Sequence, residues 1–125
     1  MKLLEYQAAE IFAEYGISVA NGVVIDNLEK IEEKIRPLSF PLVVKSQVQV
    51  GGRGKAGGIK FAEDISELKD VCGKLLHSDL KGHKVNKLLI VEKVEGTKEL
   101  YLSIILDRLH KTPLIIFSSE GGMDI

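Results

Sequence analysis

Apolar residues recur at helical spacing in three segments of the chain. The first covers residues 3–15, where Gly16 follows in the position of a left-handed C-terminal cap. The second covers residues 28–35, with Asp26 as the expected N-terminal cap, Glu29 three residues later, and Pro37 at its end. The third covers residues 65–76 and follows the capping pair Asp64 and Glu67. These patterns predict three helices.

Short runs rich in Val, Ile and Leu predict strands at 22–25, 41–45, 59–61, 87–91, 100–106 and 114–117. Polar turns at 95–97 and 107–112 predict two hairpin-like returns, and 78–84 is expected to be an exposed connection. This order of helices and strands predicts an α+β or mixed α/β fold. At the end, two glycines and Asp124 precede Ile125, as though another helix were about to begin.

Composition then narrows the function classes. The 125 residues are 45% hydrophobic and 28% charged, which is typical of a folded globular protein. A net charge of -1 excludes the broad positive field of a non-specific nucleic-acid binder, so any anion site must be local. The lone Cys72 cannot form an internal disulfide, and no signal-peptide core or membrane-length apolar run is present. We expect a cytoplasmic protein with no nucleic-acid or membrane partner.

The strongest chemical signal is a glycine cluster: five of the twelve glycines fall between residues 51 and 58, together with Arg53 and Lys55. Without a Cβ, glycine lets backbone N–H groups approach an anion closely, and the two cations add charge-assisted donors suited to phosphate. The alternative is a flexible turn between two strands. A plain turn needs neither eight residues nor embedded charges, so the pattern favours a phosphate-binding loop.

Two familiar phosphate loops do not fit this cluster. Residues 52–57 match G-x-G-x-x-G, but a dinucleotide site requires a helix to follow, and a strand is predicted at 59–61. A P-loop would require glycine where Gln49 stands and a hydroxyl residue where Ala56 stands. What remains is a glycine loop joining two adjacent strands, with Lys45 at the end of the first.

Three charged residues stand at strand ends. Lys45 closes an apolar strand, where an unpaired ammonium would be costly, so an anionic partner is expected; the alternative is a side chain that extends to solvent. Glu92 closes one strand and Glu99 opens the next. These carboxylates could accept hydrogen bonds from ribose hydroxyls or could simply be solvated strand ends.

Other catalytic constellations are lacking in the sequence. Cys72 lies on the apolar stripe of the third helix, which predicts a buried thiol rather than a nucleophile. His77, His83 and His110 show no metal-ligand spacing, so no metal site formed by this chain alone is indicated.

Several blocks in order resemble the start of the succinate–CoA ligase β-subunit family. They are residues 1–3, 5–8, 15–17, 43–48, 51–58, 98–102, 107–108 and 119–125, and they span the whole chain. The sequence departs from the family at Leu4, where histidine is usual. The resemblance implies an ATP-grasp fold, with residues 20–95 as the first lobe and residues 1–19 and 96–125 as an incomplete part of the second.

The resemblance also implies roles for individual residues. Lys45 would contact nucleotide phosphates, while Gly52, Arg53 and Gly54 would form the loop that covers them. The segment from Glu92 to Glu95 would line the base and Glu99 would hold the ribose. Ala20 has no side-chain hydrogen-bonding group, whereas the guanine-preferring type carries glutamine there, so ATP and ADP are expected over GTP and GDP.

The reaction implied belongs to the tricarboxylic acid cycle. A nucleoside triphosphate, succinate and CoA give a nucleoside diphosphate, phosphate and succinyl-CoA through an acyl phosphate and a phosphohistidine on a partner α subunit. The phosphohistidine and the Mg²⁺ ligands are expected outside these 125 residues, so the chain alone is predicted to be inactive and to self-associate. Two alternatives remain open: another nucleoside-diphosphate-forming acyl-CoA ligase, and a stand-alone non-catalytic nucleotide-binding module.

Overall fold

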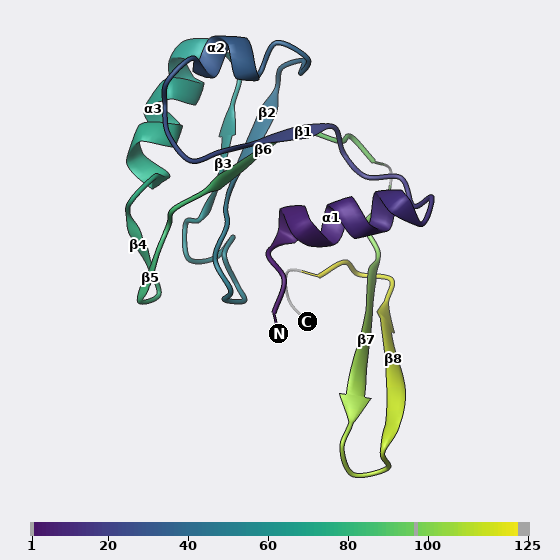
Figure 1. Ribbon diagram of the computed structural model, residues 1–125. Coiled ribbons are helices and arrows are strands. Elements are labelled where there is room, and N and C mark those ends of the chain that lie inside the picture. Colours follow the sequence, from purple (N-terminus) through teal and green to yellow (C-terminus); the bar gives the residue numbers. More distant parts are fainter. Residues whose placement is uncertain (1, 97, 123–125) are drawn as a thin grey trace. The chain divides into compact units, whose positions relative to one another are not determined.

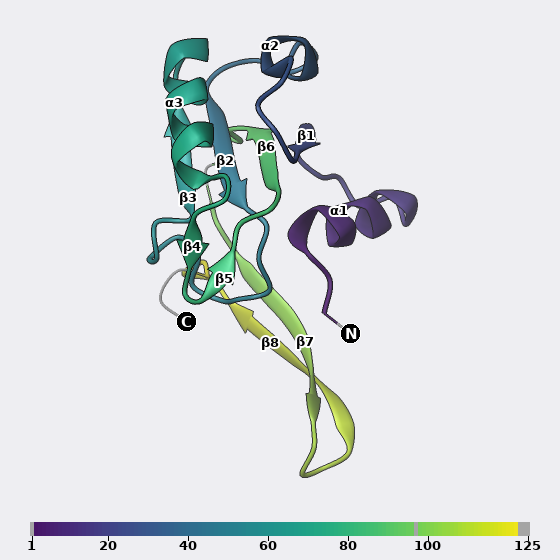
Figure 2. The same cartoon turned by 60° about the vertical axis from the view of Figure 1, so that its left-hand side comes forward.

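A computed structural model describes residues 2–96 and 98–122 (Figure 1). The chain divides into two compact units, Met1–Val94 and Glu95–Ile125, and each is described by itself. Figure 2 shows the same elements from a second direction. Across the described residues, no helix combines the length and the apolar character needed to cross a bilayer.

The first and third predicted helices are confirmed. Helix α1 spans Glu5–Glu14; the Gln7 side chain accepts a hydrogen bond from the Leu4 amide at its start, and Gly16 beyond its end has φ +78°. Helix α3 spans Ile65–Leu75, and the Asp64 side chain accepts from the Glu67 amide as the capping pattern predicts.

The second helix is shorter than predicted, and its predicted cap is wrong. Helix α2 covers only Ile31–Lys34 and begins after Lys30, which has a left-handed backbone. Asp26 does not cap it, because the Asn27 side chain accepts from the Glu29 amide and forms a turn before the helix can start. Ile31 is nevertheless buried, as the apolar pattern indicates.

The first unit is built on a four-stranded sheet in the order β1-β6-β2-β3, in which every pair is antiparallel. Strand β1 is Gly22–Ile25, β2 is Leu42–Ser46, β3 is Ile59–Ala62 and β6 is Leu88–Glu92. All four were predicted to within a residue or two. The sheet and the helices confirm the α+β class.

Successive side chains of β2 and β6 point to opposite sides of the sheet, so each face of the sheet packs against a different group of residues. Leu42, Val44, Leu88 and Ile90 point to the main core, which also receives residues from α2 and α3. The intervening residues form a smaller cluster on the other face, where Tyr6 of α1 packs against Val43, Leu89 and Val91. In both views, α3 and α1 lie on opposite sides of this sheet (Figures 1 and 2).

Two predicted connections are wrong. Residues 78–84 are not a plain exposed link: β4 (Asp79–Leu80) and β5 (His83–Lys84) form a short hairpin, and Leu80 joins the main core. A single apolar residue among polar ones gave too little periodicity to predict this. The predicted hairpin return at 95–97 is also wrong. The strand before it, β6, is already paired on both edges, with β1 and with β2, so it cannot pair with the next strand along the chain. Thr97 lies outside the described residues.

The second unit contains the other predicted return. Strands β7 (Tyr101–Asp107) and β8 (Thr112–Ser118) pair antiparallel along their whole length. The Asp107 carboxylate accepts from the amides of Leu109 and His110 and so shapes the turn between them. The helix expected to begin at Asp124 lies outside the described residues.

Candidate functional site

Lys45 lies on the sheet face that α1 covers. It follows Val44 in β2, so the alternation that points Val44 into the core turns Lys45 the opposite way. Its Nζ lies 2.8 Å from Oε1 of Glu5, in the first turn of α1. The anionic partner expected for this lysine therefore exists within the chain.

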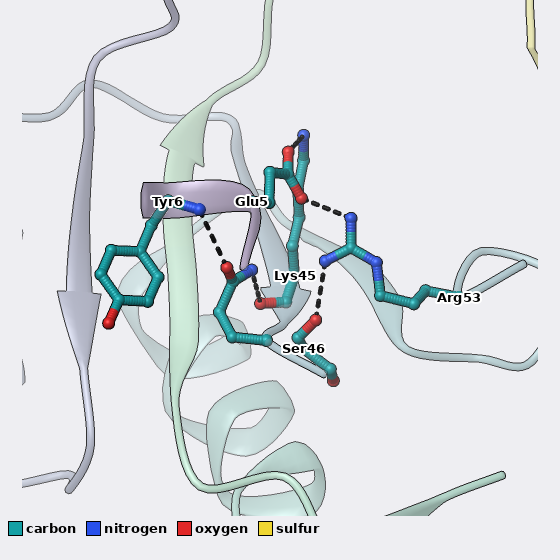
Figure 3. A network of polar contacts seen from close by, with 6 residues as sticks. Glu5, Tyr6, Lys45, Ser46 and Arg53 are labelled. Carbon is teal, nitrogen blue, oxygen red and sulfur yellow. Dashed lines mark hydrogen bonds and ion pairs between the residues drawn. The ribbon is translucent and has the colours of Figure 1, made fainter. Parts of the chain in front are cut away.

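Arg53 of the glycine loop reaches the same carboxylate. Its Nη2 lies 2.5 Å from Oε2 of Glu5, while its Nη1 donates to the backbone carbonyl of Ser46 at 2.8 Å. The Lys45, Glu5 and Arg53 side chains are 26%, 30% and 19% exposed. Figure 3 shows the carboxylate between the two cations. One anion thus neutralises part of a two-cation cluster near the end of the central strand β2.

The two cations control the ionisation of Glu5. Partial burial by itself raises the pKa of a carboxyl group. Hydrogen bonds from Lys45 and Arg53, together with their charges, outweigh that effect and hold the pKa of Glu5 below its ordinary value. Glu5 is therefore a carboxylate throughout the neutral range, and it accepts a charge-assisted hydrogen bond at each oxygen.

The start of α1 is fastened to β2 by contacts that do not involve this carboxylate. The Tyr6 amide donates to Oε1 of Gln47 at 3.1 Å, and Nε2 of Gln47 donates to the Lys45 carbonyl at 3.1 Å. The Lys87 ammonium lies 5.4 Å from the centre of the Tyr6 ring. Gln47 is buried, so these hydrogen bonds are shielded from water.

The glycine loop is folded on itself. The amides of Ala56, Gly57 and Gly58 donate to the carbonyls of Gly52, Gly54 and Arg53 at 3.1, 3.1 and 2.8 Å. Gly52 and Gly57 have φ of +70° and +81°, a backbone region that favours glycine. The amides of residues 56–58 are therefore used within the loop itself.

The β4–β5 hairpin supports this loop. A Cβ placed on Gly58 would lie 2.5 Å from Cδ2 of Leu80, so only glycine allows this close packing. The Lys81 Nζ donates to the Gly51 carbonyl at 2.9 Å and holds the other end of the loop. A segment expected to be an exposed link thus helps to shape the loop.

A largely apolar cavity of about 480 Å³ lies between α1 and the sheet of the first unit. Glu5, Tyr6, Glu10 and Lys45 form its polar part, and it is also lined by Ala20 and Gly22, just before and at the start of β1. The remaining lining is apolar and includes Ala9, Ala13, Val19, Val24, Leu89 and Val91. An apolar cavity with a few convergent charges is the usual form of a small-molecule site.

The acidic candidates are divided between the two units. Glu92 ends β6, where its carboxylate accepts from the Ser39 amide at 2.9 Å and from the Asn21 side chain at 3.3 Å. Glu95 and Glu99 belong to the second unit and are exposed. Within that unit, Glu99 lies against Gly121, whose Cβ, if present, would be 3.2 Å from the carboxyl group.

Cys72 is fully buried in the main core, as its place on the helical stripe predicts. Burial raises the pKa of this thiol to about 12, so it is not a nucleophile at neutral pH. No cluster of three or more His, Cys, Asp or Glu side chains suited to a metal occurs within residues 2–96 and 98–122.

No sequence pattern singles out Glu5 or Lys81 as residues that shape this site. Glu5 is an acidic residue at the start of a helix, which the helix dipole alone explains. Its partners stand 40 and 48 residues further along the chain, and no local pattern links them.

Comparison with known proteins identifies the family. The model of the ATP-grasp domain matches residues 2–125. Over its whole length, the chain is similar to succinate–CoA ligase [ADP-forming] β subunits. The identity is 49% to the protein from Methanothermobacter thermautotrophicus, 47% to that from Herpetosiphon aurantiacus and 43% to that from Halobacterium salinarum. The chain spans about a third of the length of these relatives: 34%, 33% and 33%.

Solved structures show the same fold. ATP citrate lyase from Methanothrix soehngenii, in complex with citrate and coenzyme A, has a TM-score of 0.73 at 22% identity, over 96% of this chain and 32% of that one. A dinucleotide-forming acetyl-coenzyme A synthetase from Ca. Korarchaeum cryptofilum has a TM-score of 0.69 at 23% identity, over 93% of this chain and 52% of that one. The fold, the glycine loop and the family match together establish that the chain belongs to the ATP-grasp domain family.

Proposed function

We propose that this chain binds the phosphate groups of ATP or ADP as the N-terminal, nucleotide-binding part of an ADP-forming succinate–CoA ligase β subunit. The observation that carries the proposal is the convergence of Lys45 and Arg53 on a single carboxylate. Two cations that already share the oxygens of one anion are arranged to receive phosphate oxygens. The high identity to named ligase β subunits supplies the reaction class.

In this proposal, Lys45 and the loop residues Gly52, Arg53 and Gly54 bind phosphate. Their role is electrostatic: they stabilise negative charge on the phosphoryl group and transfer no proton. The base contacts the segment from Glu92 to Glu95 and the cavity lining near Ala20, and Glu99 holds the ribose. Residues 20–95 form the first ATP-grasp lobe, while residues 1–19 and 96–125 contribute to the second.

The complete reaction requires more than this chain. The proposed partner is a succinate–CoA ligase α subunit carrying the phosphorylated histidine, with succinate and CoA as the other substrates, in the cytoplasm. Mg²⁺ would neutralise the triphosphate, and we expect its protein ligands outside the 125 residues. The named relatives are ADP-forming, which agrees with the preference for adenine expected from Ala20.

Nuclear magnetic resonance of the ¹⁵N-labelled chain tests phosphate binding even when affinity is low. We expect ATP to shift the amide signals of residues 45 and 51–55, and inorganic tripolyphosphate to shift the same signals. Adenosine, which lacks phosphate, should leave them in place. Equal shifts with adenosine and ATP, or no shift in this segment at millimolar ATP, would contradict the proposal.

A further inference from the structure

The Glu5 carboxylate occupies the point on which Lys45 and Arg53 converge. Resting on the proposed function, we infer that Glu5 is an internal counter-ion that holds the phosphate position until the nucleotide's phosphate displaces it. In this role Glu5 competes with the nucleotide for both cations, although no local sequence pattern singles it out. Nucleotide binding is then an exchange of one anion for another.

The geometry of the three side chains indicates that the Glu5 carboxylate takes the place of a phosphate group. Each oxygen of Glu5 bonds one cation: Oε1 to Nζ of Lys45 at 2.8 Å, and Oε2 to Nη2 of Arg53 at 2.5 Å. A phosphate group presents its oxygens to neighbouring donors in a comparable way. The carboxylate and an incoming phosphate therefore compete for the same donors.

Charge determines the direction of the exchange. With Glu5 in place, the cluster of two cations and one anion has a net charge of +1; with Glu5 turned away, it is +2. A triphosphate has more negative charges and more acceptor oxygens than a carboxylate, so it gains more from the same cations. Removing the competing charge should therefore tighten nucleotide binding.

The surrounding contacts allow Glu5 to leave without disrupting the site. Arg53 keeps its second hydrogen bond, from Nη1 to the Ser46 carbonyl. Helix α1 remains attached through the Tyr6 amide and Gln47. The Glu5 side chain is 30% exposed, so water can solvate the displaced carboxylate.

The test compares Glu5→Gln with the matched control Glu14→Gln in the 125-residue chain. Glu14 lies on the same helix and is exposed, so the control makes the same change in net charge away from the cluster. Affinities for ATP and for inorganic tripolyphosphate are measured by titration of the amide signals at residues 45 and 51–55. We expect Glu5→Gln to bind both ligands about three- to tenfold more tightly than wild type, which is the size of effect expected from removing one partly exposed charge pair. The control should bind both ligands with wild-type affinity.

The outcomes separate this inference from the proposed function. If wild type binds ATP at these residues and Glu5→Gln binds equally or more weakly, Glu5 merely positions the cations and the inference is wrong, while the proposed function stands. If neither protein binds ATP there, both fail.

A second measurement uses wild type alone and does not depend on how the variant folds. We expect ATP to move the ¹³C signal of the Glu5 carboxyl carbon towards that of an unpaired glutamate. A signal that stays in place while the loop amides shift would overturn the inference.

Discussion

Nη1 of Arg53 donates a 2.8 Å hydrogen bond to the backbone carbonyl of Ser46. Ser46 follows Lys45 at the end of β2, so this bond connects the glycine loop directly to the strand that presents the lysine. The Ser46 amide in turn donates to the Gly58 carbonyl at the far end of the loop, also at 2.8 Å. The loop is therefore tied to one residue at two places, and Arg53 is held near Lys45 by backbone as well as by charge.

Replacing Lys45 by alanine should weaken Mg-ATP binding at least tenfold, because a charge-assisted contact to phosphate contributes about 1.5–3 kcal/mol. In a complete ligase, phosphorylation of the partner histidine should be lost. Calorimetry measures the affinity, and urea unfolding checks that the fold survives. Lys74→Ala is the matched control, since Lys74 also bonds a carboxylate, that of Asp70, but on the exposed surface of α3. Unchanged ATP affinity in Lys45→Ala would contradict the assignment.

Ala20→Gln should shift nucleotide preference towards GTP, because glutamine supplies a donor and an acceptor in the lining of the cavity. The ratio of kcat/KM for ATP to that for GTP in a complete ligase is the measurement. Ala20→Leu, which adds similar bulk without an amide, should not favour GTP. A wild-type ratio that favours GTP would refute the base preference.

Gly58→Ala should destabilise the first unit by about 1–3 kcal/mol through overpacking, because the new methyl group would lie 2.5 Å from Leu80 and 3.3 Å from the Arg53 carbonyl. Gly73→Ala is the control, and its expected effect on stability has the opposite sign. Gly73 lies within α3, and its nearest neighbour would be 3.9 Å from the new Cβ, so alanine should stabilise that helix by about 0.5–1 kcal/mol. Urea unfolding of both variants measures the two changes, and equal effects would show that Leu80 does not brace the loop.

The contribution of Glu5 to stability should depend on pH. The folded-state pKa of Glu5 is lowered, so the unfolded chain binds its proton more readily and the ion pairs stabilise the fold above the ordinary value of 4.5. That stabilisation is lost as the pH falls below 4.5 through the lowered pKa. Glu5→Gln should therefore be less stable than wild type by about 1 kcal/mol at neutral pH, and this difference should shrink as the pH falls through the lowered pKa of Glu5. A difference independent of pH would mean that packing, not charge, explains the effect.

The β7–β8 hairpin should make the 125-residue chain self-associate. One face of this hairpin is entirely apolar, because the strand register places these residues side by side: Leu102, Ile104, Leu106, Pro113, Ile115 and Phe117. Ile104 and Ile115 are 69% and 65% exposed, and an apolar face of this kind favours association. Light scattering should show oligomers, and Ile104→Lys should reduce them. Thr112→Lys, on the other face, is the control, and a strictly monomeric wild type would contradict the prediction.

Local sequence patterns were sufficient to predict the features that depend only on residues close together in the chain. The Asp64 cap, the left-handed Gly16 and the buried Cys72 each follow from residues within a few positions. The glycine loop and Lys45 were also selected correctly as neighbours, because β2 and β3 pair directly across the loop.

Long-range contacts explain what the sequence could not predict. The Glu5 carboxylate meets its cations only after α1 packs on the sheet. Leu80 looks like one apolar residue in a polar link until its contact with Gly58 is known. In the same way, the turn of Asn27 displaces the cap expected at Asp26 by a competition that spacing alone does not reveal.

The antiparallel register of β2 limits how this protein can change by insertion or deletion. Lys45 is opposite Ile59 on one side and Leu89 on the other, and β2 is paired along both edges. Adding or removing one residue within the strand would turn the Lys45 ammonium into the main core and bring Val44 to the α1 face. Burying an unpaired ammonium costs several kcal/mol, so single-residue length changes between Leu42 and Ser46 should be excluded from functional descendants of this sequence.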